Sequence, residues 1–182
     1  MNYKIFFVLL IIFSLTTSCS SQKQISKNKE KPNFNKDNTT SIVETSGGII
    51  RIPGLWEPFH YDETSRQHFL RNPKGVIIGI AQNLQKAYPF FKKGMSGYNF
   101  IKTYTNWDID YQNENGNNAK IIRSNIEDEY QIWTFKDKEE IVNVFLYGIN
   151  GNYVLNLLVY TNDWEENKTI DFLKETYNLN KK

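Results

Sequence analysis

The chain has 182 residues, with 22 Lys and Arg against 20 Asp and Glu, an aromatic content of 15% and a single cysteine. Its length suits one domain of ordinary size preceded by an extension. The balance of charges, without a basic stripe, argues against a nucleic-acid partner, and one cysteine excludes a disulfide within the chain.

The N-terminus has the order of segments that is typical of an exported protein. Lys4 precedes an unbroken apolar run over 5–13, and mostly small residues then lead to Cys19. This order of charged, apolar and small segments predicts a secretory signal peptide over 1–18. The apolar run is shorter than the stretch of about 20 residues that a membrane-spanning helix needs.

The segment Leu15-Thr16-Thr17-Ser18-Cys19 resembles the lipobox of bacterial lipoproteins, although its leucine stands one place further from the cysteine than usual. The resemblance implies cleavage before Cys19 and acyl chains on its sulfur, which would anchor the protein in a membrane. No aspartate comes directly after the cysteine, so the usual sorting pattern implies the outer membrane of a Gram-negative cell, on its periplasmic face. The alternative is an ordinary secretory signal with an incidental cysteine.

Residues 19–46 are predicted to form a disordered tether that begins with the lipidated cysteine. The segment is rich in Lys, Asn, Ser and Gln and has few apolar residues, so it cannot bury enough surface to offset the entropy of ordering. The remaining residues, 47–182, are predicted to be a single domain.

The domain has strand patterns before and after a helical one. Strands are expected at 49–52, 68–71, 76–82, 120–124 and 131–136. The helical pattern begins at Ser96, which we interpret as the cap, and ends before Gly116. Its aromatic residues Phe100, Tyr104, Trp107 and Tyr111 recur at helical spacing, as in a helix that covers the sheet.

The clearest local signal is a long hairpin over 141–161. Two runs rich in β-forming residues flank Asn150-Gly151, a pair that tolerates positive φ in a type I′ turn. The second run is apolar on both of its faces, which predicts a central strand that is covered on both sides. A closing helix is expected from a capping box at Asn162-Asp-Trp-Glu165 to about Tyr177, with Trp164, Ile170, Leu173 and Tyr177 on its buried side.

These elements predict an α+β fold, a three-layer α/β/α sandwich around a mainly antiparallel sheet. The order of elements, the Pro53-x-x-Trp56 segment and the closing Phe172-Leu-x-x-x-Tyr177 segment resemble the PsbP/Mog1-like family. In that family the fold serves mostly as a binding or accessory module, so the resemblance implies a non-catalytic role by analogy of fold.

The residues offer little chemistry. His60 and His68 lie near Glu57, Asp62 and Glu63, but their spacing matches no zinc motif. No serine-nucleophile motif or Gly-rich phosphate loop appears. The carboxylate groups at 127–129, at Asp108 and Asp110, and at 165–166 are interpreted as exposed. We therefore predict no catalytic residue, metal or cofactor, while an enzyme that uses His60 or His68 with an acid stays as a third hypothesis.

The candidate site is an aromatic loop over 55–61. Trp56, Phe59, His60 and Tyr61 crowd this loop, in a stretch that contains Pro53 and Pro58. Exposed aromatic residues of this kind suit a protein partner or a sugar ring. The competing interpretation is that Trp56 plugs one end of the sandwich. The leading hypothesis is a lipid-anchored envelope lipoprotein that binds another envelope protein without catalysis. The alternative is a module that binds a small ligand or glycan through the same loop.

Overall fold

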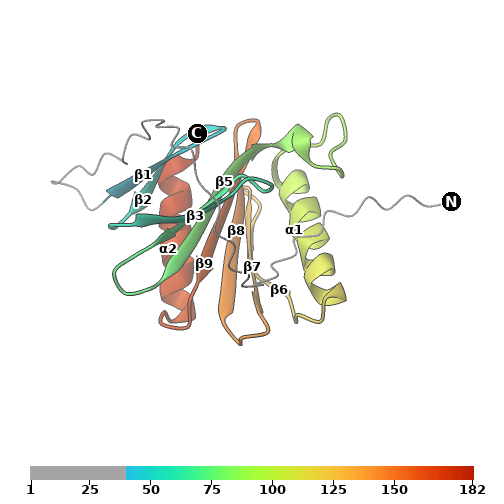
Figure 1. The fold of residues 1–182 in the computed structure, drawn as a ribbon. Helices are drawn as coiled ribbons and strands as arrows, with labels where there is room; N and C mark the ends of the chain where they lie inside the picture. Colours follow the sequence, from blue (N-terminus) through green and yellow to red (C-terminus); the bar gives the residue numbers. More distant parts are fainter. Residues whose placement is uncertain (1–39) are drawn as a thin grey trace, which may run out of the picture. The chain divides into compact units, whose positions relative to one another are not determined.

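The computed structural model describes residues 40–182, which form one large sheet, one small sheet and two long helices (Figure 1). The large sheet is antiparallel throughout, with strand order β3-β4-β5-β9-β8-β7-β6. Its strands are β3 Glu57–Asp62, β4 Gln67–Arg71, β5 Ile77–Leu84, β6 Lys120–Asn125, β7 Tyr130–Lys136, β8 Val142–Asn150 and β9 Tyr153–Tyr160. The other elements are β1 Thr40–Thr45 and β2 Gly48–Pro53, which form the small sheet, the short 3-10 helix η1 Gln85–Ala87, and the helices α1 Gly97–Glu114 and α2 Glu166–Asn180.

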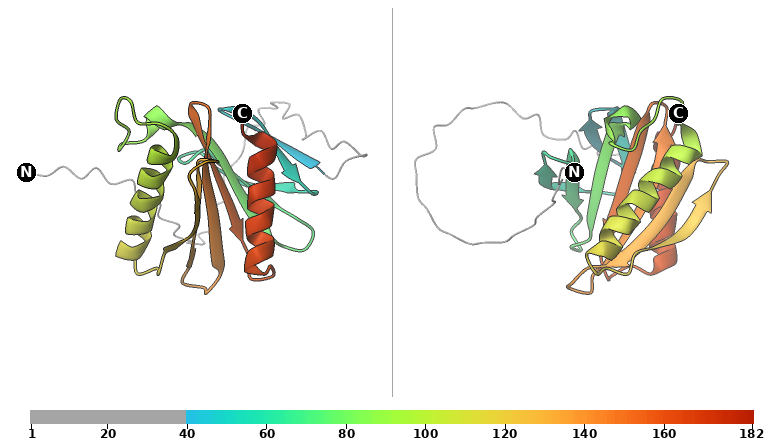
Figure 2. Two further views of the ribbon diagram at one scale, coloured as in Figure 1. Left: turned by 180° about the vertical axis from the view of Figure 1, so that it is seen from behind. Right: turned by 90° about the vertical axis from the view of Figure 1, so that its right-hand side faces the viewer.

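The two helices lie on opposite faces of the large sheet (Figures 1 and 2). α1 packs against β7 and β8, whereas α2 packs against β8 and β9 and also against β2. The buried residues accordingly form two hydrophobic clusters, one on each side of the sheet. The predicted α+β class, with an antiparallel sheet between helical layers, is confirmed.

The long hairpin is the centre of this arrangement. β9 is the middle strand of the sheet, and Val154, Leu155, Leu157, Leu158 and Val159 are all buried, as predicted for a strand covered on both faces. The turn differs from the prediction by one residue. Because Asn150 pairs with Tyr153, Gly151 and Asn152 are the central residues, and only Gly151 has positive φ (61°). That is the pattern of a type II′ turn.

The two helices form where the sequence predicts them, with corrections to their caps. Phe100 and Tyr104 are buried, but Trp107 and Tyr111 are 44% and 38% exposed, because the inner face of α1 turns towards Ile101 and Thr105. Ser96 stands at the N-cap without a side-chain hydrogen bond. On α2, Ile170, Leu173 and Tyr177 are buried as expected.

The predicted capping box of α2 is wrong. The helix begins at Glu166, and its N-cap Glu165 makes no side-chain hydrogen bond. The side chain of Asn162 instead accepts a hydrogen bond from the Val142 amide (3.0 Å) and donates one to the Glu140 carbonyl (3.2 Å). The sequence pattern is that of a helix cap, but the side-chain amide of Asn162 binds the main chain at the start of β8 instead.

The predicted boundary between tether and domain at residue 47 is also wrong. Residues 40–45 form β1, in which Ser41 and Val43 are buried. The Ser41 hydroxyl donates to the Gly54 carbonyl and accepts from the Trp56 amide, both at 2.9 Å. A short strand with polar flanks resembles a polar spacer in sequence, and pairing with β2 decides its conformation.

The predicted signal peptide, Cys19 and the tether up to residue 39 lie outside the described residues. Within residues 40–182, no helix is long and apolar enough to cross a membrane. The remaining predicted strands match β2, β4, β5, β6 and β7 to within about two residues.

Candidate functional site

The predicted aromatic loop is largely a strand at the edge of the sheet. Residues 57–62 form β3, which pairs with β4 alone, with a bulge at Phe59 between Pro58 and His60. Five of the six residues of β3 are exposed. Proline has no amide to donate to a ladder, so it is tolerated at such an edge. Pro58 also makes the strand hard to recognise in the sequence, because it interrupts the alternating pattern of a strand.

Trp56 does not belong to this surface. It is 3% exposed, its indole N–H donates to the Pro53 carbonyl at 2.7 Å, and its ring lies 5.6 Å from that of Phe172 on α2. The interpretation that Trp56 plugs the sandwich is therefore correct. A pocket lined by both Trp56 and Tyr61 is excluded by this burial.

Phe59 and Tyr61 remain on the surface, 51% and 45% exposed. Each residue from 59 to 61 faces a partner on β4. The Arg71 guanidinium lies 4.8 Å from the Phe59 ring centroid, the His60 ring stacks on Phe69 at 5.9 Å, and the Tyr61 ring lies 4.6 Å from that of His68. Cation–π and aromatic pairs of this kind hold the hairpin side chains in place. We call residues 57–71 the aromatic hairpin.

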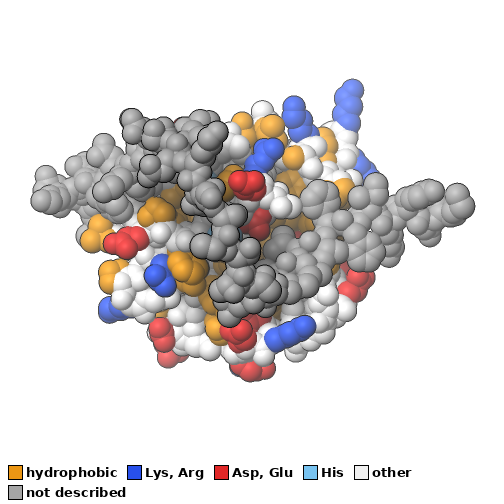
Figure 3. Space-filling view, in the orientation of Figure 1, with side chains coloured by type: hydrophobic (Ala, Val, Ile, Leu, Met, Phe, Trp, Pro, Cys, Tyr) orange, Lys and Arg blue, Asp and Glu red, His pale blue; other side chains and the backbone are white. Residues whose placement is uncertain are grey.

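The surface around the aromatic hairpin mixes hydrophobic and charged side chains. In Figure 3 hydrophobic, basic and acidic groups alternate on the flank where β3 and β4 lie in Figure 1. A hollow of about 330 Å³ opens beside it, lined by Glu57, Arg71 and the turn residues Asn72, Pro73 and Gly75. Rigid aromatic residues next to an arginine, with charges around them, are the composition of a protein-binding hot spot.

The two histidines of the aromatic hairpin cannot converge on one metal ion. Tyr61 pairs with His68, and successive strand residues point to opposite faces, so His60 and His68 lie on opposite faces of the ribbon. Burial lowers the pKa of His68. Among residues 40–182, no group of three or more His, Cys, Asp or Glu side chains is placed to hold a metal ion.

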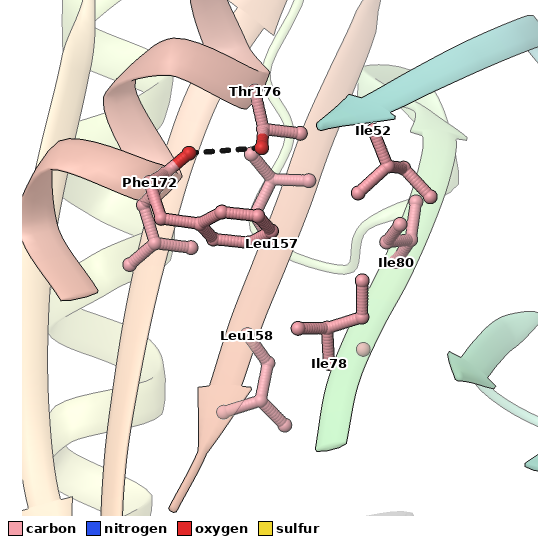
Figure 4. A pocket seen from close by; sticks show the side chains of 9 residues that line it. Ile52, Ile78, Ile80, Leu157, Leu158, Phe172 and Thr176 are labelled. Atoms are coloured by element: carbon pink, nitrogen blue, oxygen red, sulfur yellow. Dashed lines mark hydrogen bonds between the residues drawn. The ribbon is translucent and has the colours of Figure 1, made fainter. Parts of the chain in front are cut away.

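An apolar crevice runs between α2, β2, β5 and β9 (Figure 4). Ile52, Ile78, Ile80, Leu157 and Phe172 point into it, and the Thr176 hydroxyl donates back to the Phe172 carbonyl at 2.8 Å. The crevice has no room for a water-sized sphere. It is a packing seam of the core and offers no space for a ligand.

A half-buried carboxyl contradicts the prediction that Asp108 is exposed. Asp108 lies on the inner side of α1, where its Oδ2 accepts a hydrogen bond from the Tyr147 hydroxyl of β8. Burial raises the pKa of Asp108 to about 7, and the hydrogen bond from Tyr147 opposes part of that rise. The only signal in the sequence is the spacing of Asp108 four residues after Tyr104, which puts both on one face of the helix.

Three tyrosines and an asparagine form a connected group that reaches this carboxyl through Tyr147. The Tyr104 ring stacks on Tyr147 at 4.1 Å with an interplanar angle of 8°. The Tyr104 hydroxyl lies 3.4 Å from that of Tyr88 and accepts a hydrogen bond from Asn156 Nδ2 at 3.2 Å. Burial raises the pKa of all three tyrosines. We call Tyr88, Tyr104, Asp108, Tyr147 and Asn156 the tyrosine cluster.

The other acidic groups behave as ordinary surface charges or structural contacts. Asp110 is exposed. Asp128 forms an ion pair with Lys181 and accepts a hydrogen bond from Asn125 at 2.9 Å. The Glu129 carboxyl lies beside Gly97 at the start of α1. These contacts connect neighbouring elements, and none brings two carboxyl groups together as a catalytic pair.

Comparison with known protein families and with curated proteins finds no match to this chain. The aromatic hairpin and the N-terminal sequence are therefore the features from which a function can be inferred.

Proposed function

We propose that this protein is a lipid-anchored lipoprotein of the cell envelope, whose PsbP/Mog1-like domain binds another envelope protein without catalysis. The observation that carries the proposal is the aromatic hairpin. Phe59 and Tyr61 are each about half exposed and are braced by Arg71 and His68, so little side-chain entropy is lost when a partner covers them.

Side-chain recognition suits this edge better than addition of a partner strand. Pro58 removes one amide donor, and the bulge at Phe59 interrupts the regular spacing of main-chain groups. Both features are devices that protect edge strands from pairing with another chain. The partner therefore contacts the aromatic and charged side chains of the hairpin.

The membrane anchor is the second half of the proposal. The lipobox-like segment supports acylation of Cys19, with the protein held at the outer membrane and facing the periplasm. Acyl chains contribute about 0.8 kcal/mol for each buried methylene, so the domain would stay beside the bilayer where envelope proteins are concentrated. Binding of a glycan or small ligand is the weaker alternative, because Trp56 is part of the core and the hollow beside Arg71 lacks an aromatic floor.

The test is a photo-crosslink in living cells. A photoreactive amino acid at position 59 is expected to capture one membrane-associated protein, and Tyr61→Ala in the same chain is expected to reduce the yield at least about tenfold, as for a hot-spot residue. The matched control places the photoreactive residue at Ile121, which is 41% exposed on β6 at the other edge of the sheet.

Two further arms separate binding from anchoring. Labelling with a palmitate analogue is expected to mark the wild-type chain and not Cys19→Ala, and the substitution is expected to abolish the crosslink in cells. The far-ultraviolet circular dichroism of Tyr61→Ala should match that of the wild type. Equal crosslinks from positions 59 and 121 would refute the binding surface, and an unlabelled wild-type chain would refute the anchor.

A further inference from the structure

The carboxyl of Asp108 is held between α1 and the sheet by neutral groups only. Among the described residues, the ion pairs join Lys136 to Glu140 and Lys181 to Asp128, and none reaches Asp108. Its hydrogen-bond partner is the hydroxyl of Tyr147, a residue that is 1% exposed. A charged carboxylate at this place lacks a compensating cation, which makes its ionised form costly.

We propose that the Asp108–Tyr147 pair is a proton-binding site that couples the protonation of one carboxyl to the seating of α1 on the sheet. With the proton bound, the carboxyl is neutral and keeps its hydrogen bond with the Tyr147 hydroxyl. Without the proton, a negative charge lies at this half-buried place between the helix and the sheet, against the buried Tyr147. Release of this part of α1 from the sheet then hydrates the charge more fully.

The titratable groups that interact with Asp108 are three tyrosines from different elements, and Asn156 completes their hydrogen bonds through Tyr104. Tyr104 belongs to α1, Tyr147 to β8 and Tyr88 to the segment after η1, while Asn156 of β9 has no charge. Burial raises the pKa of the three tyrosines above the ordinary value of 10. Within this cluster, Asp108 is therefore the group that titrates between pH 5 and 8.

The sign of the effect depends on the two pKa values. Burial raises the pKa of Asp108 from 3.8 to about 7, so the seated state holds the proton more tightly than the open, hydrated state. Between about pH 4 and pH 7, opening therefore releases a proton, and each unit of rising pH favours opening by about tenfold. Above about pH 7 the carboxyl is ionised in both states, so a further rise in pH no longer changes the opening equilibrium.

Hydrogen exchange of the full-length protein tests the proposal. After correction for intrinsic exchange rates, the opening equilibrium of the α1 amides around Asp108 is expected to rise about a hundredfold from pH 5 to pH 8. Asp108→Asn should remove this pH dependence. Asp110→Asn, which changes an exposed acid on the same helix, should keep it, and the α2 amides should show no such rise in either variant.

A carbon-13 titration of the aspartate carboxyls provides a measurement that does not require the Asp108→Asn variant to fold. The Asp108 resonance is expected to titrate with a midpoint near 7, and Tyr147→Phe should raise that midpoint because the hydrogen bond that opposes the rise is lost. A midpoint near 4, or an unchanged pH dependence in Asp108→Asn, would overturn the proposal. These outcomes are independent of the partner and the anchor.

Discussion

Tyr177 of α2 occupies its place because the residue beneath it is a glycine. The side chain is 1% exposed, and its hydroxyl lies 2.8 Å from the Asp128 carbonyl and 2.9 Å from the Ile149 carbonyl. Burial raises the pKa of this phenol above its usual range, so it keeps its hydrogen at physiological pH. A Cβ on Gly148 of β8 would overlap the ring.

Gly148→Ala is accordingly expected to lower the free energy of unfolding by about 1–3 kcal/mol, because the ring must move away from both carbonyl groups. Urea denaturation measures this loss. Gly79→Ala is the control, since a Cβ there would meet mainly the flexible end of Gln67 and then Leu158 at 3.2 Å. Equal losses in the two variants would show that the Tyr177 ring yields freely.

The exposure of single side chains in the candidate site is what the sequence predicts least well. The sequence leaves Trp56 open between a surface group and a plug, and it predicts an exposed charge at Asp108. The exposure of a side chain depends on which element covers it, and the neighbouring residues in the sequence do not reveal that element. Phe59 and Tyr61 lie on the surface as expected, because no second layer covers their side of the edge strand.

At the scale of elements, the side chain of Asn180 hydrogen-bonds the small sheet to α2. Asn180 Nδ2 donates to the Arg51 carbonyl at 2.7 Å and to the Thr176 carbonyl at 2.6 Å. Its Oδ1 accepts from the Arg51 amide at 2.8 Å. β2 pairs with β1 alone, so these hydrogen bonds, together with buried Ile50 and Ile52, hold it against the helix.

Asn180→Ala is expected to cost about 1–3 kcal/mol of unfolding free energy, because part-buried main-chain groups of Arg51 and the Thr176 carbonyl lose a partner. Hydrogen exchange should also accelerate more in residues 40–53 than in the large sheet. Asn115→Ala is the matched control: its Nδ2 donates to Tyr111 alone, at 2.7 Å, on the exposed C-terminal end of α1. Uniform acceleration across the domain would contradict a local attachment.

Elements are predicted well where a local pattern decides them. The hairpin over 141–161 has two runs of β-forming residues around a turn signal, and both helices have apolar or aromatic residues at helical spacing. β1 and β3 escape prediction, because one is short and polar and the other contains Pro58. Pairing with a neighbouring strand stabilises both, and such pairing is not visible in either segment alone.

At the scale of the whole molecule, the domain depends on a strand that precedes the predicted boundary. β1 supplies Val43, 6% exposed, to the core and pairs along the full length of β2. Ser41 also accepts the Trp56 amide at 2.9 Å. The segment before residue 47 therefore contributes both to the core and to the position of the tryptophan at the end of the sandwich.

A chain that begins at residue 47 is expected to be less stable than one that begins at residue 40, by at least about 3 kcal/mol. Burial of Val43 accounts for roughly 1.5–3 kcal/mol of this loss, and the rest comes from the lost ladder of β2 and the uncovered side chains of Ile50 and Ile52. Thermal and urea unfolding of the two chains measure the difference. Identical midpoints would show that β1 adds nothing to the domain.

Neighbouring residues alone were enough to predict the apolar strands, both helices and the hairpin near Gly151, and the N-terminal export signal stays a prediction of the same local kind. The order of strands, the burial of Trp56 and the surroundings of Asp108 became visible only in the folded domain. The tyrosine cluster joins residues from Tyr88 to Asn156, contributed by a loop, a helix and two strands. The pKa shift of its carboxyl arises from burial among groups distant in sequence, and burial exists only once the layers have packed.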